Sequence, residues 1–180
     1  MRLIVEKLLC AMYSRDLAWH PEPEYEKAID RITALGMADA HGGALGSALV
    51  RAKYLHDRSA YTRALYLLVN KCRKRIMLSK STSYVTMMTR GVMREWIMDA
   101  CDLCNGACVI TQANGVQEQC PRCEGSGLKR YTDAERERNC GLPNGVWSRA
   151  HEDVYDQIMV ALTGAAATTI AGIKKNLEKK

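Results

Sequence analysis

Apolar residues recur at intervals of three and four along most of the chain, a spacing that predicts amphipathic helices. Glycine, proline and clustered polar residues interrupt this pattern and mark where the predicted helices end. The predicted helices cover residues 2–15, about 24–35, 57–77, about 84–99, about 133–139 and 148–164. The chain is therefore expected to be mainly α-helical.

A stretch rich in alanine and glycine, residues 37–56, precedes the clearest helical pattern. Gly42, Gly43 and Gly46 would each weaken an isolated helix by roughly 1 kcal/mol. A helix in this stretch therefore needs close packing against a neighbour, which small residues permit.

The helix predicted over residues 57–77 can begin at either of two caps. Asp57 and Ser59 both carry a side-chain oxygen that can accept from the first backbone amides of a helix. Cys72 lies on the apolar face of this helix and Cys10 on that of the first helix. We expect both to be buried core residues and not metal ligands.

Two Cys-x-x-Cys pairs dominate the middle of the chain. Fifteen residues separate the pair Cys101/Cys104 from the pair Cys120/Cys123. Four thiolates at this spacing can occupy the corners of a tetrahedron around zinc. Glycines follow both pairs, where the backbone must fold back towards the sulfurs. The sequence therefore predicts a zinc finger over residues 101–128 with one structural Zn²⁺ ion.

Disulfides and a redox-active pair are the alternatives for these cysteines. Disulfide frameworks are typical of small secreted domains, and Glu6 and Lys7 interrupt the first apolar run, so no signal peptide is expected. A thioredoxin-like centre needs one Cys-x-x-Cys at a strand-helix junction. Four thiolates leave no open position for a catalytic water. No phosphate-binding glycine loop or set of nucleophile and base is found either, so no enzymatic activity is expected.

The net charge of +6 is unevenly distributed. Residues 71–100 contain seven Lys or Arg and two acidic residues. Such a block favours an anionic partner, although a solvated helix face is an equally simple explanation. No apolar run is expected to reach the length of a membrane span, so the sequence indicates a soluble cytoplasmic protein that does not bind membranes.

The segment after the finger has the outline of a helix-turn-helix. Thr132 and Glu135 fit a capping box that starts a short helix. Two glycines and a proline in residues 140–145 predict a turn. A second helix is expected from Ser148, its N-cap, to Gly164. In a helix-turn-helix the second helix enters the DNA major groove; the alternative is an ordinary helical hairpin.

Cations around the finger and at the start of the second helix are candidate DNA contacts. Against this, acidic residues 152, 153 and 156 on the same helix would repel phosphates unless they turn away or accept from cytosine. Arg149 and His151 are placed to reach base edges. The candidate DNA-binding residues are Arg122, Lys129, Arg130, Arg136, Arg138, Arg149 and His151.

Three groups of motifs resemble the Q antitermination proteins of lambdoid bacteriophages, in particular the lambda Q type. The motifs are Gly36-Met37-Ala38 with Gly43–Gly46 and Ala64–Leu67; Cys-x-x-Cys-x-Gly at Cys101, Cys104 and Gly106 and at Cys120, Cys123, Gly125 and Gly127; and Trp147-Ser148-Arg149 followed by Tyr155-Asp156. Together they cover roughly residues 35–162. The finger alone also resembles that of J-domain co-chaperones, whereas the Trp-Ser-Arg segment points to Q.

Two departures from the Q pattern stand out. Each Cys-x-x-Cys pair and the turn that follows it form a knuckle. Cys108 occupies the position where the first knuckle of the family usually has a second glycine, so its thiol could compete as a metal ligand. Residues 1–34 show no clear match. The role of Cys140 and the function of residues 1–34 follow from neither the pattern nor the resemblance.

The resemblance implies a phage late-gene transcription factor in the cytoplasm of the bacterial host. Its expected partners are double-stranded DNA at the late promoter and host RNA polymerase with its sigma factor, with nascent RNA and a host elongation factor as further contacts. Such a protein lets polymerase pass pauses and terminators. The chain is thus expected to contain a helical bundle over 1–100, taken as the polymerase-interacting region, the zinc finger over 101–128, a helix-turn-helix-like region over 129–164 and a basic tail over 165–180. This last segment can form a final helix with a frayed basic end.

A zinc-finger co-chaperone-like module that binds proteins is the alternative. His20-Pro21-Glu22 is close to the His-Pro-Asp motif of J-domains. However, Glu replaces Asp there, no basic helix precedes it, and the sequence contains one zinc module instead of the usual pair.

Overall fold

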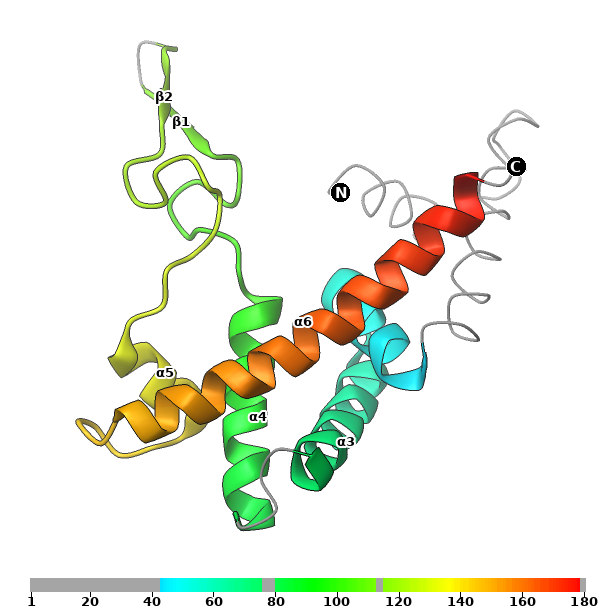
Figure 1. The fold of residues 1–180 in the computed structure, drawn as a ribbon. Coiled ribbons are helices and arrows are strands. Elements are labelled where there is room, and N and C mark those ends of the chain that lie inside the picture. Colours follow the sequence, from blue (N-terminus) through cyan, green and yellow to red (C-terminus); the bar gives the residue numbers. More distant parts are fainter. Residues whose placement is uncertain (1–42, 76–79, 113–114, 179–180) are drawn as a thin grey trace. The chain divides into compact units, whose positions relative to one another are not determined.

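The computed structural model describes residues 43–75, 80–112 and 115–178 (Figure 1). These residues are mainly helical, as the hydrophobic pattern predicts. The elements are a helix over residues 43–54, α3 (Arg58–Arg75), α4 (Thr82–Ile97), α5 (Asp133–Cys140), α6 (Arg149–Glu178) and a two-stranded sheet of β1 (Val109–Thr111) and β2 (Gln117–Gln119). The helices predicted over residues 2–15 and 24–35, and Cys10, lie outside the described residues.

The chain divides into two compact units. One comprises Met1–Val85 with Gln157–Lys180, and the other comprises Thr86–Asp156. The boundaries fall within α4 and α6, so each of these helices contributes to both units. The finger belongs entirely to the second unit.

In the first unit, α3 begins at Asp57, one of its two predicted caps. The Asp57 Oδ1 atom accepts from the N–H groups of Ser59 at 2.9 Å and Ala60 at 3.0 Å. The Ala60 amide is the main cause of the low Asp57 pKa, about 2, and the Ser59 side chain also lowers it. Arg51 adds an ion pair at 2.8 Å.

The buried face of α3 follows the predicted helical spacing. Ala60, Ala64, Leu68 and Cys72 are all buried at four-residue intervals. Burial raises the pKa of the Cys72 thiol to about 11, so this side chain is a neutral core residue. The predicted burial of Cys72 is therefore confirmed.

The helix over residues 43–54 depends on close packing, as its small residues predict. A Cβ atom added to Gly46 would overlap the Thr169 hydroxyl and lie 2.5 Å from the Ala165 carbonyl oxygen, both on α6. The two helix backbones therefore approach more closely here than any larger side chain would allow. This contact offsets the weak helical preference of the glycines.

The predicted end of the last helix at Gly164 is wrong, because α6 continues to Glu178. Its buried stripe continues through Leu162, Ala166, Thr169 and Ile173, at helical spacing on both sides of the glycine. Packing of this stripe outweighs the roughly 1 kcal/mol by which a glycine weakens a helix. The final helix expected after Gly164 is therefore a continuation of α6, which reaches Glu178.

The Arg149–Lys175 stretch of α6 is long and apolar enough to cross a membrane by length and composition, with a mean hydropathy of 1.2 over its 18-residue apolar window. This differs from the expectation that no stretch would reach such a length. Core helices of soluble proteins meet the same criterion, and α6 already packs one apolar stripe inside the protein. Of the apolar window of α6, 28% is buried inside the protein, and a single helix of this kind is weak evidence for a membrane span.

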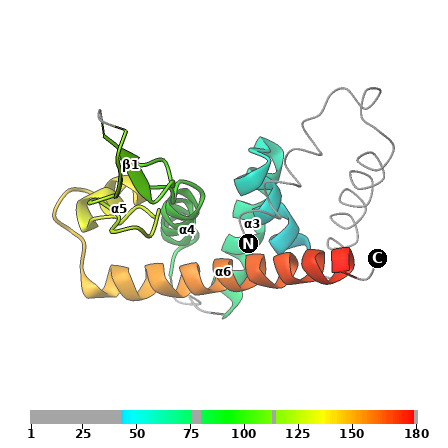
Figure 2. The ribbon, with the colours of Figure 1, turned by 90° about the horizontal axis from the view of Figure 1, so that it is seen from above.

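The second unit is built on contact between α4 and α5, which lie side by side (Figure 2). A Cβ atom on Gly91 of α4 would collide with the Cys140 sulfur of α5 and lie 3.2 Å from its backbone nitrogen. Burial raises the pKa of the Cys140 thiol to about 12, which makes it a neutral core residue.

The start of α5 is the predicted capping box. The Thr132 hydroxyl accepts from the Glu135 N–H at 3.3 Å, and the Glu135 carboxylate accepts from the Thr132 N–H at 3.0 Å. Gly141 ends the helix with φ of 70°, in the left-handed region. The connection to α6 spans residues 141–148, longer than the three or four residues typical of a helix-turn-helix.

Candidate metal centre

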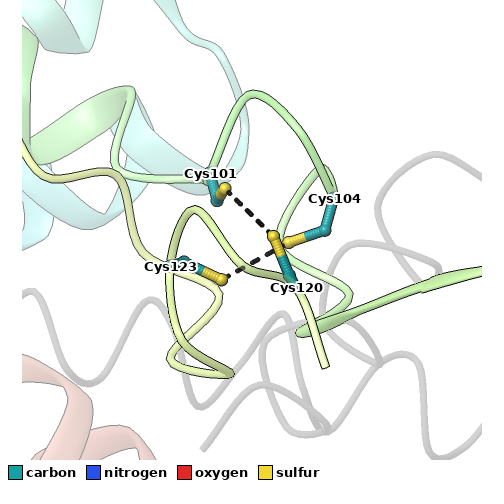
Figure 3. Close-up of side chains that lie close together, drawn as sticks. All are labelled: Cys101, Cys104, Cys120 and Cys123. Carbon is teal, nitrogen blue, oxygen red and sulfur yellow. Dashed lines mark hydrogen bonds between the residues drawn. The ribbon is translucent and has the colours of Figure 1, made fainter. Parts of the chain in front are cut away.

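The four cysteines of the two Cys-x-x-Cys pairs come together in one buried cluster. Their Sγ atoms all lie within 4.8 Å of one another and point to a common centre (Figure 3). The Cys101 and Cys120 sulfurs are 3.9 Å apart, and the Cys104 and Cys123 sulfurs are 3.7 Å apart. Metal–sulfur bonds of about 2.3 Å give a tetrahedron with edges of roughly 3.8 Å. The cluster thus has the size and donor set of a four-thiolate metal site.

These distances do not correspond to disulfide bonds, in which the sulfurs are about 2.05 Å apart. All seven cysteines among the described residues are free thiols. The cluster lies within the second unit, and the partly buried Ile110 of β1 packs against it. The four sulfurs are therefore positioned for a metal and shielded from water.

Each cysteine pair is followed by the same left-handed turn. Asn105 and Gly106 have φ angles of 47° and 80°, and Glu124 and Gly125 have angles of 51° and 76°. Two successive residues with positive φ turn the chain back towards the sulfurs, and glycine adopts this conformation without steric strain. The two knuckles are thus near-copies of each other in backbone conformation.

Cys108 completes the first knuckle at the position that Gly127 occupies in the second. Their φ angles are 69° and 71°. The replacement of glycine by cysteine therefore leaves the turn unchanged but places a residue with a Cβ atom in the left-handed region. The half-buried Cys108 sulfur lies 3.7 Å from the Gly106 carbonyl oxygen and outside the four-sulfur cluster.

Backbone amides face the cluster sulfurs. The Gly127 N–H donates to the Cys123 sulfur at 3.3 Å. Burial raises the pKa of the Cys123 thiol, but hydrogen bonds from the Gly127 amide, from the Cys120 and Cys104 side chains and, last, from the Gly125 amide together outweigh burial and lower the pKa to about 7. These amides favour the thiolate form, which is the form that binds metal.

The base of the finger is closed by hydrogen bonds between its two ends. The Cys101 N–H donates to the Gly127 carbonyl at 2.9 Å, and the Lys129 N–H donates to that of Asp99 at 2.8 Å. These bonds tie the first knuckle to the chain that leaves the second. The cluster is therefore anchored directly to the C-terminal end of α4.

Two of the predicted DNA contacts are paired with finger carboxylates. Arg130 forms a bidentate pair with Glu124, at 2.7 and 3.1 Å. The Arg122 Nε atom lies 3.4 Å from Asp102. All four side chains are well exposed, so these pairs contribute little stability, but they offset the positive charge of both arginines.

Lys129 is held more firmly. Its ammonium lies 3.0 Å from Glu135 and 3.7 Å from Asp102, and over the Tyr131 ring at 4.7 Å from the centroid. The hydrogen bond to Glu135 is the main cause of a raised Lys129 pKa. This cation therefore bridges the finger and the start of α5.

Arg136 belongs to a partly buried network that the sequence did not predict. Its Nε and Nη2 atoms donate to Glu95 of α4 at 3.2 and 3.3 Å, and the Tyr155 hydroxyl donates to the same carboxylate at 2.8 Å. The guanidinium also lies 5.2 Å from the Tyr155 ring centroid. Burial and Glu95 raise the pKa of Tyr155. Arg136 thus joins α4, α5 and α6 in the second unit.

The other predicted contacts lie near the start of α6 or on the exposed side of α5. Arg138 and Arg149 are exposed, and neither forms an ion pair with an acidic side chain in the described part of the chain. The His151 Nδ1 atom lies 2.8 Å from the Ser148 hydroxyl, and its ring stacks on Trp147. Ser148 thus precedes α6 as predicted, with its hydroxyl directed to His151.

The turn before α6 is organised by the buried carboxylate of Glu137. Its two oxygens accept from the N–H groups of Gly145 at 3.0 Å and Trp147 at 2.6 Å. These bonds, first that to Gly145, lower the Glu137 pKa. Trp147 then packs edge-on against Tyr155.

Glu95 and Glu137 are the structurally important residues that sequence reasoning missed. Glu95 offered one signal, since it is one of only two acidic residues in the basic stretch 71–100. Glu137 offered no comparable signal.

Comparison of the chain with protein-family models and with curated proteins finds no match. The structure by itself shows a mainly helical protein with a four-cysteine cluster that could hold a metal ion.

Proposed function

We propose that this chain is a zinc-containing, non-enzymatic transcription antitermination protein of the lambdoid phage Q type. The observation that carries the proposal is the position of the cysteine cluster: two matching knuckles connect α4 to the capping-box helix α5, and the Trp147-Ser148-Arg149 segment follows at the start of α6. This order of finger, short helix and Trp-Ser-Arg helix is the order of motifs that resembles Q.

The metal in this proposal is one structural Zn²⁺ ion bound by Cys101, Cys104, Cys120 and Cys123. Four thiolates in a tetrahedral arrangement are typical of structural zinc sites and also of iron–sulfur sites. The spacing of the two Cys-x-x-Cys pairs, with fifteen residues between them, favours zinc. The ion would stiffen a segment that has almost no apolar core of its own.

DNA binding is assigned to the region that follows the finger. Arg138 and Arg149 are the strongest candidates for phosphate or base contacts, because both are exposed and neither forms an ion pair with a carboxylate in the described residues. Arg122 and Arg130 can exchange their exposed carboxylate partners for phosphates at little energetic cost. Arg136 and Lys129 serve mainly to support the fold.

In the proposed mechanism the protein binds a late-promoter element and engages host RNA polymerase paused nearby with its sigma factor. The modified polymerase then reads through pauses and terminators. The long connection between α5 and α6 means that the DNA-reading geometry resembles a helix-turn-helix only in outline.

Transcription from a late promoter with purified host RNA polymerase tests this function. The template carries a terminator downstream, and readthrough is measured with and without the protein. We expect readthrough to rise with the protein, and to rise only on templates that keep the promoter-proximal element. Equal termination with and without protein on the intact template would contradict the proposal.

A further inference from the structure

The hairpin between the two knuckles differs in charge from the rest of the second unit. From Leu103 to Pro121 the chain contains no lysine or arginine, and Glu118 is its only charged residue. Nucleic-acid surfaces depend on cations that neutralise phosphates, so this hairpin is not suited to a polyanion. Depletion of charged side chains is instead typical of the centre of protein interfaces.

The hairpin also has outward backbone groups on β1 for which the described residues offer no hydrogen-bond partner. The Cys120 N–H donates to the Cys108 carbonyl, and the Gln112 N–H donates to that of Val116. In an antiparallel ladder, hydrogen-bonded residue pairs alternate with pairs that are not hydrogen-bonded. Between the pairs 108/120 and 112/116, the hydrogen-bonded pair is therefore Ile110 with Glu118. The backbone groups of Val109 and Thr111 therefore point away from β2.

The outer edge of β1 lacks the usual features that block strand addition. It carries no lysine and no proline, and all three of its side chains are β-branched. Thr111 and Val109 are exposed, Val109 at 37%. The β2 edge is less open, because the Gln119 side chain lies over Gly125 of the second knuckle. Figure 1 shows the hairpin at the far end of the finger from α4 and α5.

We infer that the outer edge of β1 binds an extended, uncharged segment of a protein partner by strand addition. The outward N–H and C=O groups of Val109 and Thr111 supply the main-chain bonds, and the exposed Val109 side chain supplies an apolar contact. The inference rests on the proposed function, because it identifies that partner as host RNA polymerase.

The decisive variant is Thr111→Pro. Proline removes an N–H group that faces outward and leaves the ladder with β2 intact, a position where strands tolerate it. Gln117→Pro is the matched control on the β2 edge, and Val109→Ser removes the apolar contact without changing the backbone. Metal content and duplex DNA affinity are measured for each variant to verify that the finger is folded.

Binding to purified host RNA polymerase holoenzyme is then measured with labelled protein. We expect Thr111→Pro to weaken binding about fivefold to tenfold, the effect of one lost hydrogen bond, and Val109→Ser to weaken it in the same direction. Gln117→Pro should bind like wild type.

Equal binding by wild type, Thr111→Pro and Val109→Ser would overturn this inference alone. A loss of DNA affinity in folded Thr111→Pro, with polymerase affinity unchanged, would overturn it in favour of a nucleic-acid contact. If the wild-type protein does not bind polymerase, the proposed function fails and this inference fails with it.

Discussion

At the scale of single residues, Cys108 has an unfavourable backbone conformation. Its φ of 69° matches that of Gly127 at the equivalent position, and the left-handed region costs a residue with a Cβ atom roughly 1–2 kcal/mol. We expect Cys108→Gly to raise the free energy of unfolding of the metal-loaded protein by about 1 kcal/mol, measured by chemical denaturation. Metal stoichiometry should not change, because the Cys108 sulfur lies outside the cluster.

The control is the opposite kind of change, from glycine to a residue with a Cβ atom, at the equivalent position of the second knuckle. In Gly127→Ala the new Cβ atom would lie 2.9 Å from the Gly106 carbonyl oxygen and 3.0 Å from the Cys108 sulfur, in a left-handed conformation. This variant should be less stable than wild type. A lower metal stoichiometry in Cys108→Gly would show that Cys108 is a ligand after all.

The predicted DNA contacts also separate at this scale into paired and exposed cations. Arg138→Gln should leave stability unchanged and reduce the slope of log affinity against log salt for duplex DNA by about 0.9, the value for one lost phosphate contact. Arg136→Gln should instead lower the melting temperature, because Glu95 keeps only the Tyr155 hydrogen bond. Binding titrations at several salt concentrations, with thermal denaturation in parallel, distinguish the two. An unchanged slope in Arg138→Gln would remove it from the interface.

At the scale of secondary-structure elements, replacing a helical glycine by alanine can raise or lower stability, depending on what lies beside the glycine. A Cβ atom added at Gly164 of α6 meets nothing within 4 Å, whereas one at Gly46 would overlap Thr169. We expect Gly164→Ala to raise the free energy of unfolding by up to about 1 kcal/mol and Gly46→Ala to lower it. Paired denaturation curves measure both. A stabilising Gly46→Ala would mean that the helix over 43–54 does not pack closely on α6.

The connection between α5 and α6 should depend on pH through Glu137. Its folded pKa is lowered from 4.5 by the amides of Gly145 and Trp147, so its contribution is fully present above about pH 4.5 and is lost as pH falls through the folded value. Glu137→Gln should therefore lower the melting temperature at pH 7, and the difference from wild type should shrink as the pH falls below 4.5. Thermal scans from pH 3 to 7 test this. A difference that grows on acidification would contradict it.

The elements also show what a sequence can and cannot predict. The cysteine cluster, the Thr132 capping box and the Asp57 cap follow from residues close together in the chain, and local spacing is enough to identify them. The Glu95 network joins residues 41 and 60 positions apart, which no local pattern encodes. The end of α6 was mispredicted for the same reason, because tertiary packing outweighs the local preference of Gly164.

At the scale of the whole molecule, the two units differ in what stabilises them. The first has a helical core of buried residues from α3, α6 and the helix over 43–54, whereas the finger of the second has four cysteines and little else. Structural zinc contributes on the order of 10 kcal/mol to folding at such sites. The finger should therefore depend on metal, whereas the first unit should not.

Metal removal tests this difference directly. Treatment with a chelator, or the Cys101→Ser substitution, should abolish the dispersed NMR signals of residues 101–128 and lower metal content, because three thiolates cannot enclose the ion. Signals of α3 should persist. Cys72→Ala is the matched control: it removes a buried cysteine that is not a ligand, so it should lower stability but keep full metal content. Finger signals that survive verified metal loss would show that hydrogen bonds alone hold the finger, and the proposed role of zinc would then be wrong.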